Sequence, residues 1–210
     1  MIDQVIKVTE SRLRAVGVYG EVIRDPENSK HIIVKIYQSG DTERWKSFLF
    51  TAYRLELRKV ISPPNPNPVT TYDNREAAEQ AMKPDQQVMP YLLRSDGSSK
   101  FVIVDKDVIV DGRNIRDAAA IPIGGNYEIN FSLNPDGAQR FGEWTGKNIN
   151  NYLAVILDEK VMSAAYIKSQ IFDSGQITGR FTKAQAEDIA ISLKSGYLPA
   201  DLTIVSQTEF

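Results

Sequence analysis

Residues 175–200 read GQITGRFTKAQAEDIAISLKSGYLPA and contain the clearest structural signals of the chain. The first residues predict a strand, and Thr182 then supplies the hydroxyl that caps a helix N-terminus. The apolar positions that follow share one helical face and are Ala186, Ile189, Ala190 and Leu193. Gly196 favours a helix end, and Pro199 prevents the helix from resuming. The stretch therefore predicts a strand followed by a helix with one buried face.

The charge balance of the whole chain is close to neutral. Its 210 residues include 25 basic and 27 acidic side chains, for a net charge of -2. Nucleic-acid binders usually carry an excess of lysine and arginine that displaces counterions, so we expect no nucleic-acid partner. The chain has no cysteine, which excludes disulfides, thiolate nucleophiles and cysteine-ligated zinc.

No apolar run approaches the roughly 20 residues that a membrane-spanning helix needs. Charged residues interrupt the apolar positions of residues 1–17, so this segment lacks the shape of a signal peptide. Taken alone, the sequence predicts a soluble globular protein.

The first section, residues 1–61, predicts the order helix, strand, strand, helix, strand. Gly17 suits the left-handed end of the first helix. The turn-rich tract at residues 26–30 predicts a hairpin, whose apolar face is formed by Ile32, Val34 and Ile36. Ser39 or Asp41 is the expected cap of the second helix. A ferredoxin-like unit reads βαββαβ, so this section predicts such a unit with its first strand missing.

Four prolines fall within six residues of the tract SPPNPNPVTT, residues 62–71. Proline lacks an amide donor and fixes its own φ, so this tract predicts a domain boundary. Residues 73–83 predict a short exposed helix capped by Asp73. Residues 91–110 predict a hairpin around the turn SDGS.

The third section predicts a regular alternation of strands and helices. NYEINFSL, residues 126–133, reads as a strand, and Asn134 is the expected cap of a helix opened by Pro135. NYLAVILD, residues 151–158, is almost continuously apolar and predicts a central strand. LTIVSQ, residues 202–207, predicts a last strand. The fold class is therefore α+β.

Three patterns that would indicate an enzyme or an ion site fail in detail. His31 is the only histidine and no G-x-S-x-G motif accompanies it, so we predict no catalytic residue. FGEWTGKN, residues 141–148, lacks the glycine that a phosphate loop requires six residues before Lys147. DKDVIVDG, residues 105–112, has Ile109 at a position where a calcium loop has a ligand. We therefore predict neither a cofactor nor a metal.

Five segments, in order, resemble the SecD family of protein-export membrane proteins. GQITGRFTKAQAEDIAISLKSGYLPADLTIV resembles the end of that family's large first extracytoplasmic domain. VDGRNIRDA resembles its LTGKDLKDA element, and residues 129–167 resemble the element that contains LAIVLDGKV. Residues 5–25 and 52–60 resemble its N-terminal blocks. Departures occur at Glu159 and Ala165, where the family usually has glycine and proline, and at Asp173-Ser174.

The resemblance implies a ferredoxin-like base, its first strand missing here, with an inserted α+β head. Residues 1–61 plus 201–210 would form the base, residues 62–90 a proline-rich connection with a short helix, and residues 91–200 the head. The two crossings between them would form a hinge. Its candidate residues are Ser62, Pro63, Pro64, Leu198, Pro199 and Ala200.

The resemblance also implies a function in protein export. The domain would transiently hold unfolded preprotein emerging from the SecYEG channel, with head–base motion coupled to the proton gradient in the full-length protein. Its partners would include SecF, and the membrane would be reached only through transmembrane segments absent here. The full-length protein would lie in the bacterial cytoplasmic membrane, with this domain on the periplasmic side. The alternative is a structural module that docks on other translocase subunits without gripping substrate.

Overall fold

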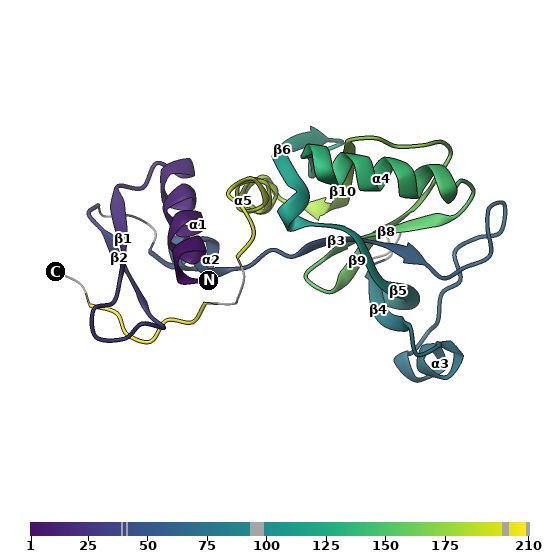
Figure 1. The fold of residues 1–210 in the computed structure, drawn as a ribbon, viewed down its shortest axis with the longest axis horizontal. Helices are drawn as coiled ribbons and strands as arrows, with labels where there is room; N and C mark the ends of the chain where they lie inside the picture. The colour runs from purple at the N-terminus through teal and green to yellow at the C-terminus, as the bar shows by residue number, and fades with distance from the viewer. Residues whose placement is uncertain (39, 41, 93–98, 199–201, 209–210) are drawn as a thin grey trace.

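The computed structural model describes residues 1–38, 40, 42–92, 99–198 and 202–208. Figure 1 shows two groups of elements, which we call the first section and the barrel section, with one helix lying between them. The first section consists of α1 (Ile2–Ala15), β1 (Gly20–Arg24), β2 (Ile32–Ile36) and α2 (Thr42–Phe50). The mixed composition of helices and strands confirms the α+β class.

The first section forms a small core between two helices and a hairpin. The buried face of α1 includes Val5, Val8 and Leu13. Gly17 follows the end of α1 and has a φ of 69°, the left-handed conformation that the sequence predicts there. β1 and β2 pair antiparallel from Gly20↔Ile36 to Arg24↔Ile32. Their apolar side chains pack with those of the two helices, because each element has one apolar face to bury.

Five strands of the barrel section form a closed barrel. In barrel order they are β3 (Leu55–Val60), β5 (Ser99–Asp111), β4 (Gln86–Leu92), β9 (Lys160–Tyr166) and β8 (Tyr152–Leu157). Every residue of β8 is buried, which confirms the prediction of a central strand at this position. The short helix α3 (Arg75–Ala81) packs against β4 and β5 through Ala78.

β3 lies in the barrel and not in the sheet of the first section, which corrects the grouping predicted from the sequence. It pairs with β5 on one side and with β8 on the other. Leu55, Leu57 and Val60 are all buried in the barrel section. The alternating pattern predicted the strand correctly, but alternation does not specify which sheet a strand joins. The division of the chain into base, connection and head remains otherwise a prediction.

A three-stranded sheet covers one side of the barrel and carries two helices. The sheet has the order β10 (Ser174–Phe181), β7 (Asn126–Leu133), β6 (Ile115–Ile123). The helices are α4 (Pro135–Lys147) and α5 (Lys183–Lys194), and the short η1 (Gly112–Asn114) precedes β6. Ile129, Phe141 and Ile177 belong to the large core that this layer shares with the barrel.

The predicted helix caps are confirmed at two of three described positions. Asn134 Oδ1 accepts the amide of Gly137, and Thr182 Oγ1 accepts the amide of Gln185. Asp73 does not cap α3, because Asn74 accepts the amide of Ala77 while Asp73 pairs with Lys100. The predicted caps Ser39 and Asp41 and the turn SDGS lie outside the described residues.

The chain after α5 does not form the predicted last strand. Residues 202–208 form no strand, although Leu202 packs beside Leu198 and α1. The apolar run LTIV predicted a strand, but a strand also needs a partner for its backbone groups. No described strand pairs with this segment.

Candidate functional site

Two segments connect the first section to the barrel section. Residues 51–54 run from α2 to β3, and residues 195–198 follow α5 (Figure 1). Leu198 is buried against Val5 and Val8 of α1, and Gln4 Nε2 donates to the carbonyl of Tyr197 at 3.1 Å. The second crossing is therefore attached to α1 on the side of the first section.

Arg12 is a buried cation beside the first crossing. Its Nη1 donates to the carbonyls of Phe48 and Leu49 at 3.1 and 3.0 Å, at the last turn of α2. Burial lowers the pKa of Arg12 to about 10. Carbonyls at a helix C-terminus lack partners within the helix and carry partial negative charge, so they offset part of the cost of burying the guanidinium.

The structure does not bring the predicted hinge residues together. Ser62 lies beside the barrel, where its hydroxyl accepts the amide of Thr70 at 3.0 Å. Pro63 and Pro64 are exposed. The backbone amide of the next residue, Asn65, donates to the carbonyl of Asn150. Leu198 lies instead against α1. Pro199 and Ala200 lie outside the described residues.

A cleft of about 820 Å³ separates the two sections. We call it the section cleft. One wall comes from α1 and α2 and includes Val16, Trp45 and Phe48. The opposite wall comes from β6 and α5 and includes Ala118–Ala120 and Ile191. α5 faces both sections, because Ile191 packs against the core of the first section while Ala186 and Ile189 belong to the core of the barrel section.

Three charged residues line the section cleft, Glu187, Asp188 and Lys194, and two of them form ion pairs. Lys194 Nζ lies 2.9 Å from Asp117 Oδ1, and Lys183 Nζ lies 3.8 Å from Glu187 Oε1. The hydrogen bond from Lys194 lowers the pKa of Asp117. The surface of the cleft is therefore mixed, with alanine and aromatic side chains beside polar ones.

The cleft residues of β6, Ala118–Ala120, were not predicted from the sequence. Their sequence, AAAIP at residues 118–122, combines small side chains with a proline inside a strand. Proline within a sheet is confined largely to edge strands. The proline within this alanine-rich strand could therefore have indicated that β6 is an edge strand.

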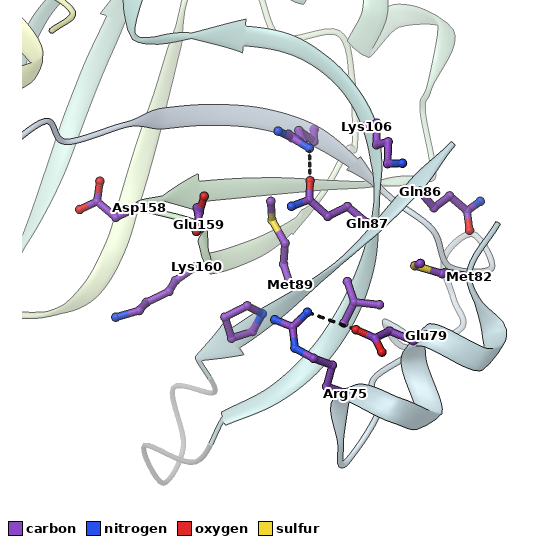
Figure 2. Close-up of a pocket in the computed structure, with 13 residues that line it drawn as sticks. Arg75, Glu79, Met82, Gln86, Gln87, Met89, Lys106, Asp158, Glu159 and Lys160 are labelled. Carbon is purple, nitrogen blue, oxygen red and sulfur yellow. Dashed lines mark hydrogen bonds and ion pairs between the residues drawn. The ribbon is translucent and has the colours of Figure 1, made fainter. Parts of the chain in front are cut away.

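A second cavity of about 780 Å³ lies beside the barrel, between α3, β4 and the turn that joins β8 to β9. Figure 2 shows Asp158, Glu159 and Lys160 on one side and Glu79 and Met82 on the other. Arg58 Nη2 lies 2.6 Å from Glu56, and Arg75 Nη1 lies 3.4 Å from Glu79. Its walls thus carry charges of both signs, several of which are paired with each other.

The residues considered for catalysis and ion binding have local structural contacts. His31 Nδ1 lies 3.4 Å from Asp25 within the β1–β2 hairpin. Asp111 caps η1 and pairs with Arg113, and Asp105 accepts the amide of Asp107. Across the described ranges, no group of three or more potential metal ligands is present. Within the same ranges, no helix combines the length and apolarity needed to cross a membrane.

Comparison with known proteins identifies one family. The family model described as SecDF, P1 head subdomain, matches residues 86–200. Protein translocase subunit SecD of Koribacter versatilis (strain Ellin345) is 34% identical over 209 residues, covering 98% of this chain and 38% of that protein. The same subunit of Aquifex aeolicus (strain VF5) is 33% identical over 208 residues, covering 99% and 39%. The chain thus spans well under half the length of these relatives.

Two solved structures share the fold. One, described as "Structure and function of a membrane component SecDF that enhances protein export", has a TM-score of 0.71 at 22% identity, over 100% of this chain and 93% of that chain. The other, SecDF in a super-membrane-facing form, has a TM-score of 0.70 at 24% identity, over 98% of this chain and 27% of that chain. At these identities the structures support the α+β fold of the whole chain.

Proposed function

This chain belongs to the SecDF family, and we propose that it is the first extracytoplasmic domain of a SecD-type subunit that assists protein export by transiently holding unfolded preprotein. The observation that carries the proposal is the match of the P1 head subdomain over residues 86–200. The relatives at 33% to 34% identity are named as subunits of a protein translocase. The domain would act by binding and motion, without catalysis and without a cofactor.

The proposal places the domain on the periplasmic side of the bacterial cytoplasmic membrane. Transmembrane segments elsewhere in the full-length subunit would anchor it beside the SecYEG channel and SecF. The two-stranded sheet of β1 and β2 would then be part of a ferredoxin-like base, completed by two further strands from the remainder of the subunit, because β3 lies in the barrel. This arrangement is supported by the helix and strand order of the first section and by its open two-stranded sheet.

The section cleft is the proposed holding surface. Its walls come from both sections, so a rotation of one section against the other changes the width of the cleft. The paired charges and the apolar residues suit weak contact with many different sequences, and weak contact permits repeated release. In the full-length protein, the proton gradient would drive the rotation by favouring one of two arrangements.

The proposed hinge consists of residues 51–54 and the segment that begins at residue 195. Leu198, Pro199 and Ala200 belong to the second of these segments. We place the first crossing at residues 51–54 and not at Ser62–Pro64, because the proline tract is attached to the barrel. Asn65 donates to Asn150, and Tyr152 Oη donates to the carbonyl of Asn67 at 2.6 Å.

A fluorescence-anisotropy titration tests the holding function. The probe is a labelled, permanently unfolded preprotein segment, and a folded protein of similar size is the control. Cysteines replacing Ser11 and Glu187, on opposite walls of the cleft, are joined by a short bis-maleimide in this cysteine-free chain. Weak binding that is lost on cross-linking, but kept in each single-cysteine variant treated with the same reagent, supports a moving grip. Absence of binding by the untreated domain would contradict it.

A docking function is the second candidate, and the β1–β2 hairpin favours it. Tyr19 and Tyr37 are 73% and 53% exposed, and their ring centroids lie 5.6 Å apart. Exposed aromatic pairs are typical of protein interfaces. If the domain only docks, replacing both tyrosines with serine abolishes its co-purification with translocase subunits, and the unfolded probe does not bind.

A further inference from the structure

β6 is the edge strand of the three-stranded sheet, and its free edge faces the section cleft. In the sheet order β10–β7–β6, β6 has one neighbour among the described strands, β7. Ala118, Ala119 and Ala120 of β6 line the cleft. Because a strand directs alternate backbone groups to its two sides, part of the β6 backbone is directed toward the cleft.

The β6–β7 turn indicates which backbone groups point outward. Gly124 and Gly125 both have positive φ, 54° and 86°, as in a two-residue hairpin turn whose flanking residues bond to each other. Those flanking residues are Ile123 and Asn126. Counting back in steps of two, Ile121 and Ala119 also bond to β7. The backbone groups of residues 122, 120 and 118 therefore face outward.

Two independent observations agree with this register. Pro122 has no amide hydrogen and occupies an outward position, where none is needed for the β6–β7 ladder. The amide of Ala118 donates to Asp117 Oδ1 at 3.0 Å, away from β7. Asp117 and Pro122 thus protect the two ends of the edge, as edge strands of soluble proteins require. Between them, the carbonyl of Ala118 and both backbone groups of Ala120 have no hydrogen-bond partner within the part of the chain that the structure describes.

We propose that this open part of β6 binds an extended segment of unfolded polypeptide as an additional strand. The proposal rests on the holding function and specifies its binding mode. One donor and two acceptors on a strand edge are complementary to another extended backbone, and main-chain pairing of this kind tolerates many sequences. The methyl side chains of Ala118–Ala120 allow the added strand to approach closely.

The surroundings of the edge define the chemistry of the bound segment. Val16, Trp45 and Phe48 lie on the facing wall and offer apolar contacts to its side chains. Two of the charged residues that line the cleft form ion pairs, Lys194 with Asp117 and Glu187 with Lys183, and Asp188 adds a further acidic side chain to the lining. The segment that fits best therefore lacks acidic side chains and has small or apolar ones.

The test uses this chain and a short fluorescein-labelled peptide of alternating valine and threonine. Ala120→Pro removes the outward amide while sparing the β6–β7 ladder, as Pro122 already does two residues later. Ala120→Gly is the matched control, because it alters the same position and keeps the amide. Thermal unfolding confirms that both variants fold. We expect Ala120→Pro to weaken binding about tenfold, since a carbonyl of the peptide loses its donor, and Ala120→Gly to bind within about twofold of the unmodified chain.

Each other outcome overturns the proposal in a recognisable way. If the peptide binds equally to the unmodified chain and Ala120→Pro, the holding function stands and the β6 edge is not its site. If Ala120→Gly weakens binding as much as Ala120→Pro, packing of the methyl group is responsible. Unchanged binding of a peptide N-methylated at alternate residues would exclude main-chain pairing. Self-association of the chain that Ala120→Pro abolishes would assign the edge to a second copy. Absence of any peptide binding removes both proposals.

Discussion

Arg12 of α1 donates a hydrogen bond from Nη1 to the carbonyl of Thr51, 2.8 Å away, at the first residue of the crossing into β3. The same nitrogen reaches two carbonyls at the end of α2. One side chain thus joins both helices of the first section to the start of the crossing. Thr51 is therefore held to the first section, so motion at the proposed first crossing would occur within residues 52–54.

Replacing Arg12 with methionine should destabilise the chain by about 2–4 kcal/mol, because three carbonyls lose a buried charged donor. Urea unfolding measures the change. Arg14→Met is the control, since Arg14 is 72% exposed and its partner Glu10 lies 4.0 Å away; it should change stability by less than about 0.5 kcal/mol. Equal effects of the two substitutions would show that the Arg12 contacts contribute no stability.

Two glycines of α4 should respond to alanine with opposite signs. A Cβ on Gly137 would lie 2.7 Å from Cβ of Asn114, so Gly137→Ala should destabilise by about 1–3 kcal/mol through overpacking. A Cβ on Gly146 would lie 3.4 Å from the flexible side chain of Gln170, and Gly146→Ala should stabilise by about 0.5–1 kcal/mol through helix propensity. Calorimetric melting temperatures test both, and a shift of the same sign in the two variants would refute the packing argument.

Thr145 joins α4 to the segment before β10. Its buried hydroxyl donates to the carbonyl of Phe141 at 2.8 Å and accepts the amide of Ile171 at 2.9 Å. Thr145→Val keeps the shape but leaves that amide without an acceptor, so we expect a loss of about 1–3 kcal/mol. Thr145→Ser keeps the hydroxyl and should lose about 1 kcal/mol for the missing methyl group. Chemical denaturation measures the free energy of unfolding of both variants. A smaller loss of stability for Thr145→Val than for Thr145→Ser would contradict the role of the hydroxyl.

Asp111 should contribute to the acid limb of the stability curve. Burial favours its neutral form, but hydrogen bonds and charge from Arg113 outweigh burial and lower the pKa of Asp111 below its usual 3.8. Its contribution is therefore complete above the unfolded-state pKa and is lost as the pH falls through the lowered value. Asp111→Asn should reduce the melting temperature near neutral pH and flatten its decline below about pH 4. The control is Asp107→Asn, at an exposed position of the same strand, which should leave the dependence of melting temperature on pH unchanged. If Asp111→Asn lowers the melting temperature equally at all pH values, titration of Asp111 does not contribute.

The sequence predicted local structure well where a single residue determines it. Thr182, Asn134 and Gly17 mark helix ends in both the sequence and the structure, because capping depends on nearby chemistry. The sequence did not indicate which strands far apart in the chain pair with each other. The alternation of residues 53–61 predicted a strand, but its partners β5 and β8 lie far along the chain.

The section cleft could not be predicted from the sequence, because its walls come from four elements that no sequence pattern relates to each other. The proline tract was predicted to separate domains because proline disrupts regular structure. Hydrogen bonds through Asn65 and Asn67 attach it instead to the barrel, and such bonds leave no periodic signal in the sequence.

The position of β3 also affects the order in which the chain can fold. α1, β1, β2 and α2 contact one another within the first 50 residues, whereas Leu55 of β3 pairs with Leu157, about a hundred positions later. Contacts of low sequence separation form fastest, because less loop entropy is lost in closing them. A chain that emerges N-terminus first could therefore form the contacts among α1, β1, β2 and α2 while β3 still lacks β8, before Ile191 and Leu198 are added to the first section. Closure of the barrel would be the late, slow step.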